Sequence, residues 1–199
     1  MPAERSVEIE KKFDVEAGTP IPDWTRVPGV ARVSEGEERH LDAGYLDTAD
    51  ARLAKFGVAV RRRVGGHDAG WHIKGPLVNG ARVELGWPLT DDVPAELMAE
   101  IAQWTEDRLS PLARIVNDRT AYNLLDENGG VIAEFVNDRV KASDLRRGVD
   151  REWCEWEIEL GPAAPEDHEA FFAEVERIAL EAGATKPSSA SKLARALGR

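Results

Sequence analysis

Charged side chains recur at every second residue in several segments of this chain, and this alternation restricts its fold more than any other feature. From residue 7 to 13 the chain reads Val-Glu-Ile-Glu-Lys-Lys-Phe, which places Glu8, Glu10 and Lys12 on one face of a strand. Later segments place on one face Arg61 and Arg63; His72 and Lys74; Arg82 and Glu84; Glu134 and Asp138; and Glu155, Glu157 and Glu159. One such strand is typical of a sheet with a solvated face. Because several strands carry charges of both signs on one face, we expect these charged faces to point into the interior of the fold.

The apolar faces and the turn residues predict the rest of the fold. Strands are expected at 7–13, 39–47, 58–64, 71–74, 81–89, 113–125, 131–140 and 151–160. Helices are expected at 49–55, after Pro94 with Asp91 and Asp92 as its cap, at 165–182, and after a Ser-rich stretch near the C-terminus. The helices can cover the apolar strand faces. We therefore expect an α+β fold, an antiparallel β-barrel of about eight strands with helices packed on the outside, as a single domain over residues 4–199.

Composition narrows the class of partner. The formal net charge of -11 argues against a nucleic-acid partner, because most of the surface would repel phosphate backbones. No apolar stretch approaches the roughly 18 residues of a membrane span, so no membrane partner is expected. The N-terminus lacks the pattern of a secretory signal, and Cys154 is the only cysteine, so no intramolecular disulfide can form. These features predict a cytoplasmic protein.

Charges inside a barrel need partners, because a desolvated ion is costly unless it is paired or binds metal. Clustered carboxylates would raise one another's pKa unless a divalent cation neutralised them, and such oxygen donors suit Mg²⁺ or Mn²⁺. Arginine and lysine on neighbouring strands would hold phosphate oxygens. The interior therefore predicts a metal-bound polyphosphate.

Short motifs in the same order resemble the CYTH superfamily, the triphosphate tunnel metalloenzymes. Glu8 to Lys12 resembles its ExExK signature, Tyr45 to Thr48 a YYDT-like segment, and Leu53 to Arg63 an L…G…LRxR segment with Val60 where leucine is usual. Arg82 to Glu84 resembles an RxExE segment in which Gly86 replaces the last acid. The pattern is completed by Lys74, Arg119, Asp138, Glu157, Glu159 and Lys192.

The resemblance implies an eight-stranded antiparallel tunnel, two-metal chemistry and a substrate with a triphosphate group. It implies that Glu10, Glu157 and Glu159 are catalytic, and that the metal ligands are Glu8, Glu10, Asp138, Glu157 and Glu159. The implied substrate-binding residues are Lys12, Arg61, Arg63, Lys74, Arg82, Glu84, Arg119 and Lys192, with Glu84 orienting a neighbour or helping the metal shell.

Four further residues receive simpler interpretations. By alternation Arg62 should point outward, and Glu155 is expected at the barrel mouth. His72 shares a face with Lys74, but a lone histidine is usually structural or a hydrogen-bonding neighbour. Cys154 has no evident partner and is interpreted as a small buried side chain.

The favoured function is metal-dependent hydrolysis of a phosphoanhydride in inorganic triphosphate or a short organic triphosphate. One alternative is a class IV-like adenylate cyclase, in which the 3′-hydroxyl of ATP attacks the α-phosphate. Another is a non-catalytic binding module for nucleotides or polyphosphate, against which the paired acids argue. The sequence leaves open the identity of the triphosphate and the oligomeric state, for which a homodimer is one option.

Overall fold

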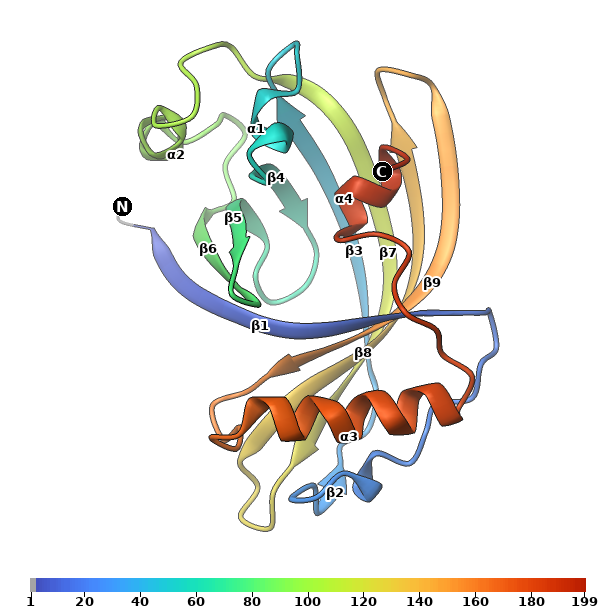
Figure 1. Cartoon of the computed structure of the whole chain (residues 1–199). Helices are drawn as coiled ribbons and strands as arrows, with labels where there is room; N and C mark the ends of the chain where they lie inside the picture. Colours follow the sequence, from blue (N-terminus) through green and yellow to red (C-terminus); the bar gives the residue numbers. More distant parts are fainter. Residues whose placement is uncertain (1–2) are drawn as a thin grey trace.

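Long antiparallel strands close into a barrel in the computed structural model, which describes residues 3–199 (Figure 1). Around the barrel the strand order is β7-β3-β4-β5-β6-β1-β9-β8, and β8 pairs with β7, so eight strands of the described chain form a closed ring. Their bounds are Glu4–Val15 (β1), Glu37–Asp47 (β3), Ala59–Val64 (β4), Gly70–Val78 (β5), Ala81–Pro88 (β6), Ser110–Leu125 (β7), Val131–Asp144 (β8) and Val149–Leu160 (β9). The predicted α+β barrel is confirmed.

A short additional strand, which the sequence did not predict, lies outside this ring. It is β2 (Arg32–Val33), and it pairs only with the end of β7 at Leu124 and Leu125. Two residues in a proline- and glycine-rich segment are too few to show alternation.

The register of the strands brings charged residues from distant segments onto the same inner face. In the β1–β9 pair Glu10 lies opposite Glu159, and Lys12 lies opposite Glu157. Other pairs are Glu8 with Arg82, Lys74 with Glu84, and Arg119 with Asp138. Because side chains alternate along a strand, opposite partners share a face, and each of these pairs points into the barrel.

Two groups of helices cover the outer faces, as predicted. Helix α3 (His168–Glu181) and the 3-10 helix η1 (Trp24–Arg26) pack on the outward residues of β1, β8 and β9, where Trp24, Phe135 and Trp156 form a buried aromatic cluster. Helices α1 (Arg52–Lys55) and α2 (Ala95–Ile101) pack over β4, β5 and β6. The expected aspartate cap of α2 is wrong, since Pro94 occupies the N-cap position and no side chain caps this helix.

Helix α4 (Lys192–Ala196) differs from the other helices because it packs into one end of the barrel (Figure 1). Leu193, Ala196 and Leu197 contact inward-facing apolar residues of the strands, among them Tyr45 and Trp153. The Ser191 side chain caps the helix by accepting from the N–H of Ala194 at 3.0 Å. This packing places Lys192 inside the barrel. Among residues 3–199, no helix is both long and apolar enough to cross a membrane.

Candidate functional site

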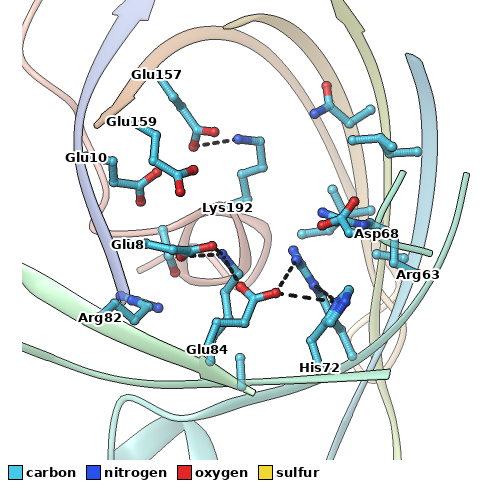
Figure 2. A pocket seen from close by; sticks show the side chains of 18 of the residues that line it. Glu8, Glu10, Arg63, Asp68, His72, Arg82, Glu84, Glu157, Glu159 and Lys192 are labelled. Atoms are coloured by element: carbon cyan, nitrogen blue, oxygen red, sulfur yellow. Dashed lines mark hydrogen bonds and ion pairs between the residues drawn. The ribbon is translucent and has the colours of Figure 1, made fainter. Parts of the chain in front are cut away.

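The barrel encloses a cavity of about 500 Å³ whose wall carries most of the predicted site residues (Figure 2). The wall includes Glu8, Glu10, Lys12, Arg61, Arg63, Lys74, Arg82, Glu84, Arg119, Glu157, Glu159 and Lys192. Asp138 lies behind this wall and is fully buried. The structure thus brings the predicted set together, while the role of each residue remains a prediction.

Three of the carboxylates are already neutralised by three cations. We call Asp138, Glu155 and Glu157, together with Lys12, Arg119 and Lys192, the paired cluster. The Lys192 ammonium lies 2.9 Å from Asp138, 2.5 Å from Glu155 and 2.7 Å from Glu157. Three acids and three bases balance in charge, as burial requires.

Arg119 and Lys12 complete the paired cluster from the other side. The Arg119 guanidinium donates to both Asp138 oxygens at 2.8 Å and to Glu157 at 2.9 Å, and Lys12 donates to Glu157 at 2.6 Å. Burial by itself would raise the pKa of Glu157, but the charges of Lys12 and Lys192 outweigh it and hold this pKa well below its usual range. Glu157 is therefore ionised and fully paired.

The expectation that Glu155 lies at the barrel mouth is wrong. Its residue is 5% exposed, and its carboxylate is held by Lys192 and by the indole N–H of Trp153. The physical reason is α4, which closes this end of the barrel and delivers the lysine to Glu155.

A second set of carboxylates lacks matching cations. We call Glu8, Glu10 and Glu159 the acidic trio; their side chains lie close to one another on one side of the cavity (Figure 2). Glu10 is 3.1 Å from Lys12, which also serves Glu157, and Glu8 is 2.7 Å from Lys74. Within residues 3–199, Glu159 has no ion pair or side-chain hydrogen bond.

Two carboxyl groups of the acidic trio, Glu8 and Glu159, have a raised pKa. Burial and the charges of Glu8 and Glu10 raise the pKa of Glu159 to about 7. Burial also raises the pKa of Glu8, although Lys74 acts against it. Carboxylate oxygens are the donors that hard divalent cations bind, so the acidic trio is a candidate metal site. Among the described residues Asp138, Glu155 and Glu157 also bring ligand atoms within 4.8 Å of one another, but cations of the paired cluster already contact all three.

Opposite charge lies beside the acidic trio, on β4, β5 and β6. Lys74 joins Glu8 to Glu84, at 2.7 and 2.8 Å, and Arg61 lies 3.3 Å from Glu84. Arg82 has no hydrogen bond or ion pair among the described residues, and the buried Nε of Arg63 has no hydrogen-bond partner there. Free guanidinium donors inside a cavity are suited to anionic oxygens.

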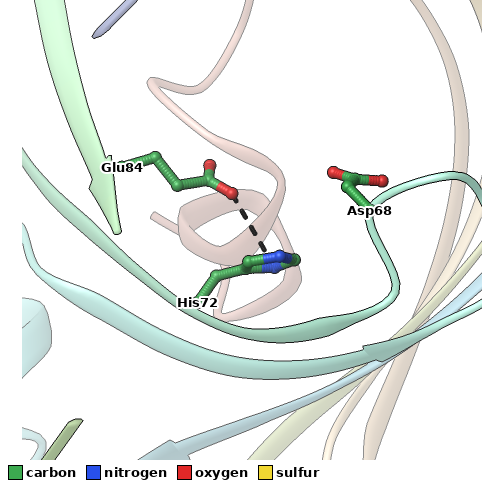
Figure 3. A group of neighbouring side chains, drawn as sticks. All are labelled: Asp68, His72 and Glu84. Carbon is green, nitrogen blue, oxygen red and sulfur yellow. Dashed lines mark ion pairs between the residues drawn. The ribbon is translucent and has the colours of Figure 1, made fainter. Parts of the chain in front are cut away.

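The loop between β4 and β5 also reaches the cavity. Asp68 from this loop pairs with Arg63, and Asp68, His72 and Glu84 gather their ligand atoms in one place (Figure 3). This group resembles a metal site in composition. However, Arg61 and Arg63 contact its members directly, and their positive charges disfavour a cation there.

Sequence reasoning missed Arg39, which lines the cavity from β3 and pairs with Glu134 at 3.1 Å. Leu41 and Ala43, the next inward positions of β3, are apolar, so the alternation of charge was lost in this strand. The outward direction expected for Arg62 is confirmed, because its Nε donates to the carbonyl oxygen of Thr90 at 2.9 Å and it does not line the cavity.

The CYTH domain profile matches residues 6–196, and the chain belongs to the CYTH domain family, whose enzymes are metal-dependent. Two uncharacterized proteins from two strains of Mycobacterium tuberculosis are each 37% identical to it over 211 residues, which cover 98% of this chain. The chain spans about 40% of the length of these curated relatives.

Solved structures share the fold. A proposed adenylate cyclase of Bacillus halodurans superposes with a TM-score of 0.66 at 19% identity, over 96% of this chain and 97% of its own. A proposed adenylyl cyclase of Hippeastrum with a dominant triphosphatase activity gives 0.60 at 16% identity, over 96% and 95%. At these identities the likeness concerns the barrel and its covering helices.

Proposed function

We propose that this chain is a metal-dependent triphosphatase that hydrolyses a phosphoanhydride of inorganic triphosphate or a short organic triphosphate. The observation that carries the proposal is the acidic trio, in which Glu159 has no ion pair among the described residues, beside arginines with free donors in one cavity. A pure anion-binding module needs the arginines but gains nothing from uncompensated carboxylates. A metal-bound triphosphate satisfies both.

The acidic trio would hold the divalent ion, with Mg²⁺ or Mn²⁺ as the proposed species. Bound there, the ion would offset the carboxylate charges and polarise phosphate oxygens. Asp138 and Glu157 stay predicted metal ligands, but their oxygens are now bound by Arg119, Lys192 and Lys12. They would become available only if phosphate drew those cations away.

The basic residues would bind and orient the phosphate chain. Arg61, Arg63, Lys74 and Arg82 lie around the acidic trio and would hold the oxygens of the reacting phosphate, where negative charge shifts during an in-line displacement. Glu84, which contacts Lys74 and Arg61, would keep both side chains directed into the cavity.

Lys12, Arg119 and Lys192 would act at the end of the cavity nearest α4. Glu157 contacts all three and would keep them directed into the cavity. The side chains of Glu157, Arg119 and Lys192 are 10–16% exposed, and this partial burial strengthens their contacts.

The Hippeastrum protein, with its dominant triphosphatase activity on the same fold, supports hydrolysis over cyclisation. The test is to incubate the protein with inorganic triphosphate, thiamine triphosphate and ATP, each with Mg²⁺ or Mn²⁺, and to identify the products. Hydrolysis of inorganic triphosphate gives one phosphate and one pyrophosphate. Cyclic AMP with pyrophosphate from ATP would show the cyclase instead, and binding without any product would show a binding module.

A further inference from the structure

His72 lies inside the barrel but belongs to neither the acidic trio nor the basic wall. It sits on β5, between Arg61 of β4 and Gly86 of β6 in the strand register, and is 5% exposed. Figure 3 shows its ring beside the Glu84 carboxylate, at the edge of the cavity. A buried imidazole among charged groups needs a defined hydrogen-bonding role.

The hydrogen bond with Arg61 defines the protonation of this ring. The Nε of Arg61 donates to the Nδ1 of His72 at 3.1 Å. Since arginine is always a donor, Nδ1 must be an acceptor without a proton, so the ring is neutral with its proton on Nε2. Burial and the charge of Arg61 also lower the pKa of His72, to about 3.

Arg61 also has a side-chain hydrogen bond with Tyr45, and two further acceptors of different charge hold it. His72 binds its Nε, and Glu84 binds its Nη2 at 3.3 Å. Lys74 also contacts Glu84 and Glu8, so the two cations Arg61 and Lys74 are already matched by two carboxylates. A neutral second acceptor fixes the direction of the guanidinium without adding a third negative charge.

Gly86 provides the space for this arrangement. A Cβ at position 86 would lie 3.4 Å from Cδ2 and 3.9 Å from Nε2 of His72, so a longer side chain there would compete with the ring for space. A carboxylate in that space would bring a second negative charge next to Glu84 and cancel charge on Arg61.

We propose that His72 is a positioning residue, which fixes the guanidinium of Arg61 for triphosphate binding through a hydrogen bond that adds no negative charge. The proposal rests on the triphosphatase function proposed above. A carboxylate acceptor would orient Arg61 equally well, but at hydrogen-bond distance it would offset the charge that attracts phosphate.

Three substitutions separate orientation from charge. In His72→Asn the amide oxygen can replace Nδ1 as a neutral acceptor, in His72→Asp the acceptor has the same shape but is charged, and in His72→Leu no acceptor remains. Binding of a non-hydrolysable imido analogue of inorganic triphosphate with Mn²⁺ is measured by titration calorimetry, with thermal unfolding of each free protein. We expect His72→Asn to bind within about threefold of the wild type, and His72→Asp and His72→Leu to bind at least tenfold more weakly.

Equal affinities of His72→Asn and His72→Asp would overturn the charge part of the proposal, and wild-type affinity of His72→Leu would overturn the orientation part. If His72→Leu does not fold, the isosteric pair His72→Asn and His72→Asp still tests the proposal. A long-range ¹H–¹⁵N spectrum of the four histidines tests the hydrogen bond without substrate, and His72 should be the neutral Nε2–H form. Wild-type protein that binds no triphosphate but shows this tautomer would refute the proposed function, and with it the role in binding, while the hydrogen bond would stand.

Discussion

Without metal, the barrel should lose stability as pH rises through the range in which Glu159 ionises. The folded protein raises the pKa of this carboxyl from 4.5 to about 7. Because folding raises this pKa, the folded state favours the protonated carboxyl group. The contribution of Glu159 to the free energy of unfolding is therefore fully present below about pH 4.5 and is lost as pH rises through about 7. The difference of about 2.5 between the two pKa values, at about 1.36 kcal/mol for each pKa unit, corresponds to a loss of about 3 kcal/mol in the free energy of unfolding.

Glu159→Gln tests this directly, since glutamine has the same shape and stays neutral. Thermal unfolding in EDTA at pH 5 and pH 8 should show the wild type losing several degrees more than the variant between the two pH values. Glu152→Gln, an exposed residue on the same strand, is the matched control and should behave as the wild type. Added Mn²⁺ should stabilise the wild type at pH 8. If the melting temperatures of Glu159→Gln and the wild type depend on pH in the same way, the conclusion that Glu159 has no compensating cation is refuted.

Three further substitutions test other parts of the cavity. Glu10→Gln should reduce turnover by on the order of tenfold to a thousandfold with the fold intact, and wild-type turnover would contradict a role at the metal. Arg61→Ala should weaken triphosphate use in steady-state kinetics, whereas Arg62→Ala, which faces outward, should leave it nearly unchanged; equal losses would contradict the alternation of faces. Lys192→Met leaves three buried carboxylates with two cations and should lower the free energy of unfolding at neutral pH by about 3–5 kcal/mol in urea titrations, so unchanged stability would contradict the paired cluster.

The alternation of side chains was sufficient to predict the eight strands of the barrel and most of their inner faces, but not β2 or the inward direction of Arg39. Arg61, Arg62 and Arg63 are chemically alike and consecutive, yet their directions follow from the period of two alone. The period of two and the residue types are therefore enough to predict the barrel and most of the residues that line it.

Electrostatic roles within the barrel could not be predicted in this way. Glu157 and Glu159 lie two residues apart on one face, but the pKa of the first is lowered by its cations and that of the second is raised to about 7. The difference comes from the register of β1 against β9 and from the position of α4, which brings Lys192 to one carboxylate and not the other. Both depend on contacts between segments far apart in the chain.

We propose that in the substrate-free protein the acidic trio, and not the paired cluster, holds the divalent ion. Electron paramagnetic resonance of free Mn²⁺ measures binding to the metal-free protein without any substrate. We expect Glu159→Gln to weaken Mn²⁺ binding at least tenfold. Glu155→Gln, which changes an acid already paired with Lys192, should retain Mn²⁺ binding once its folding is verified by circular dichroism. Loss of binding in Glu155→Gln with wild-type binding in Glu159→Gln would contradict this proposal.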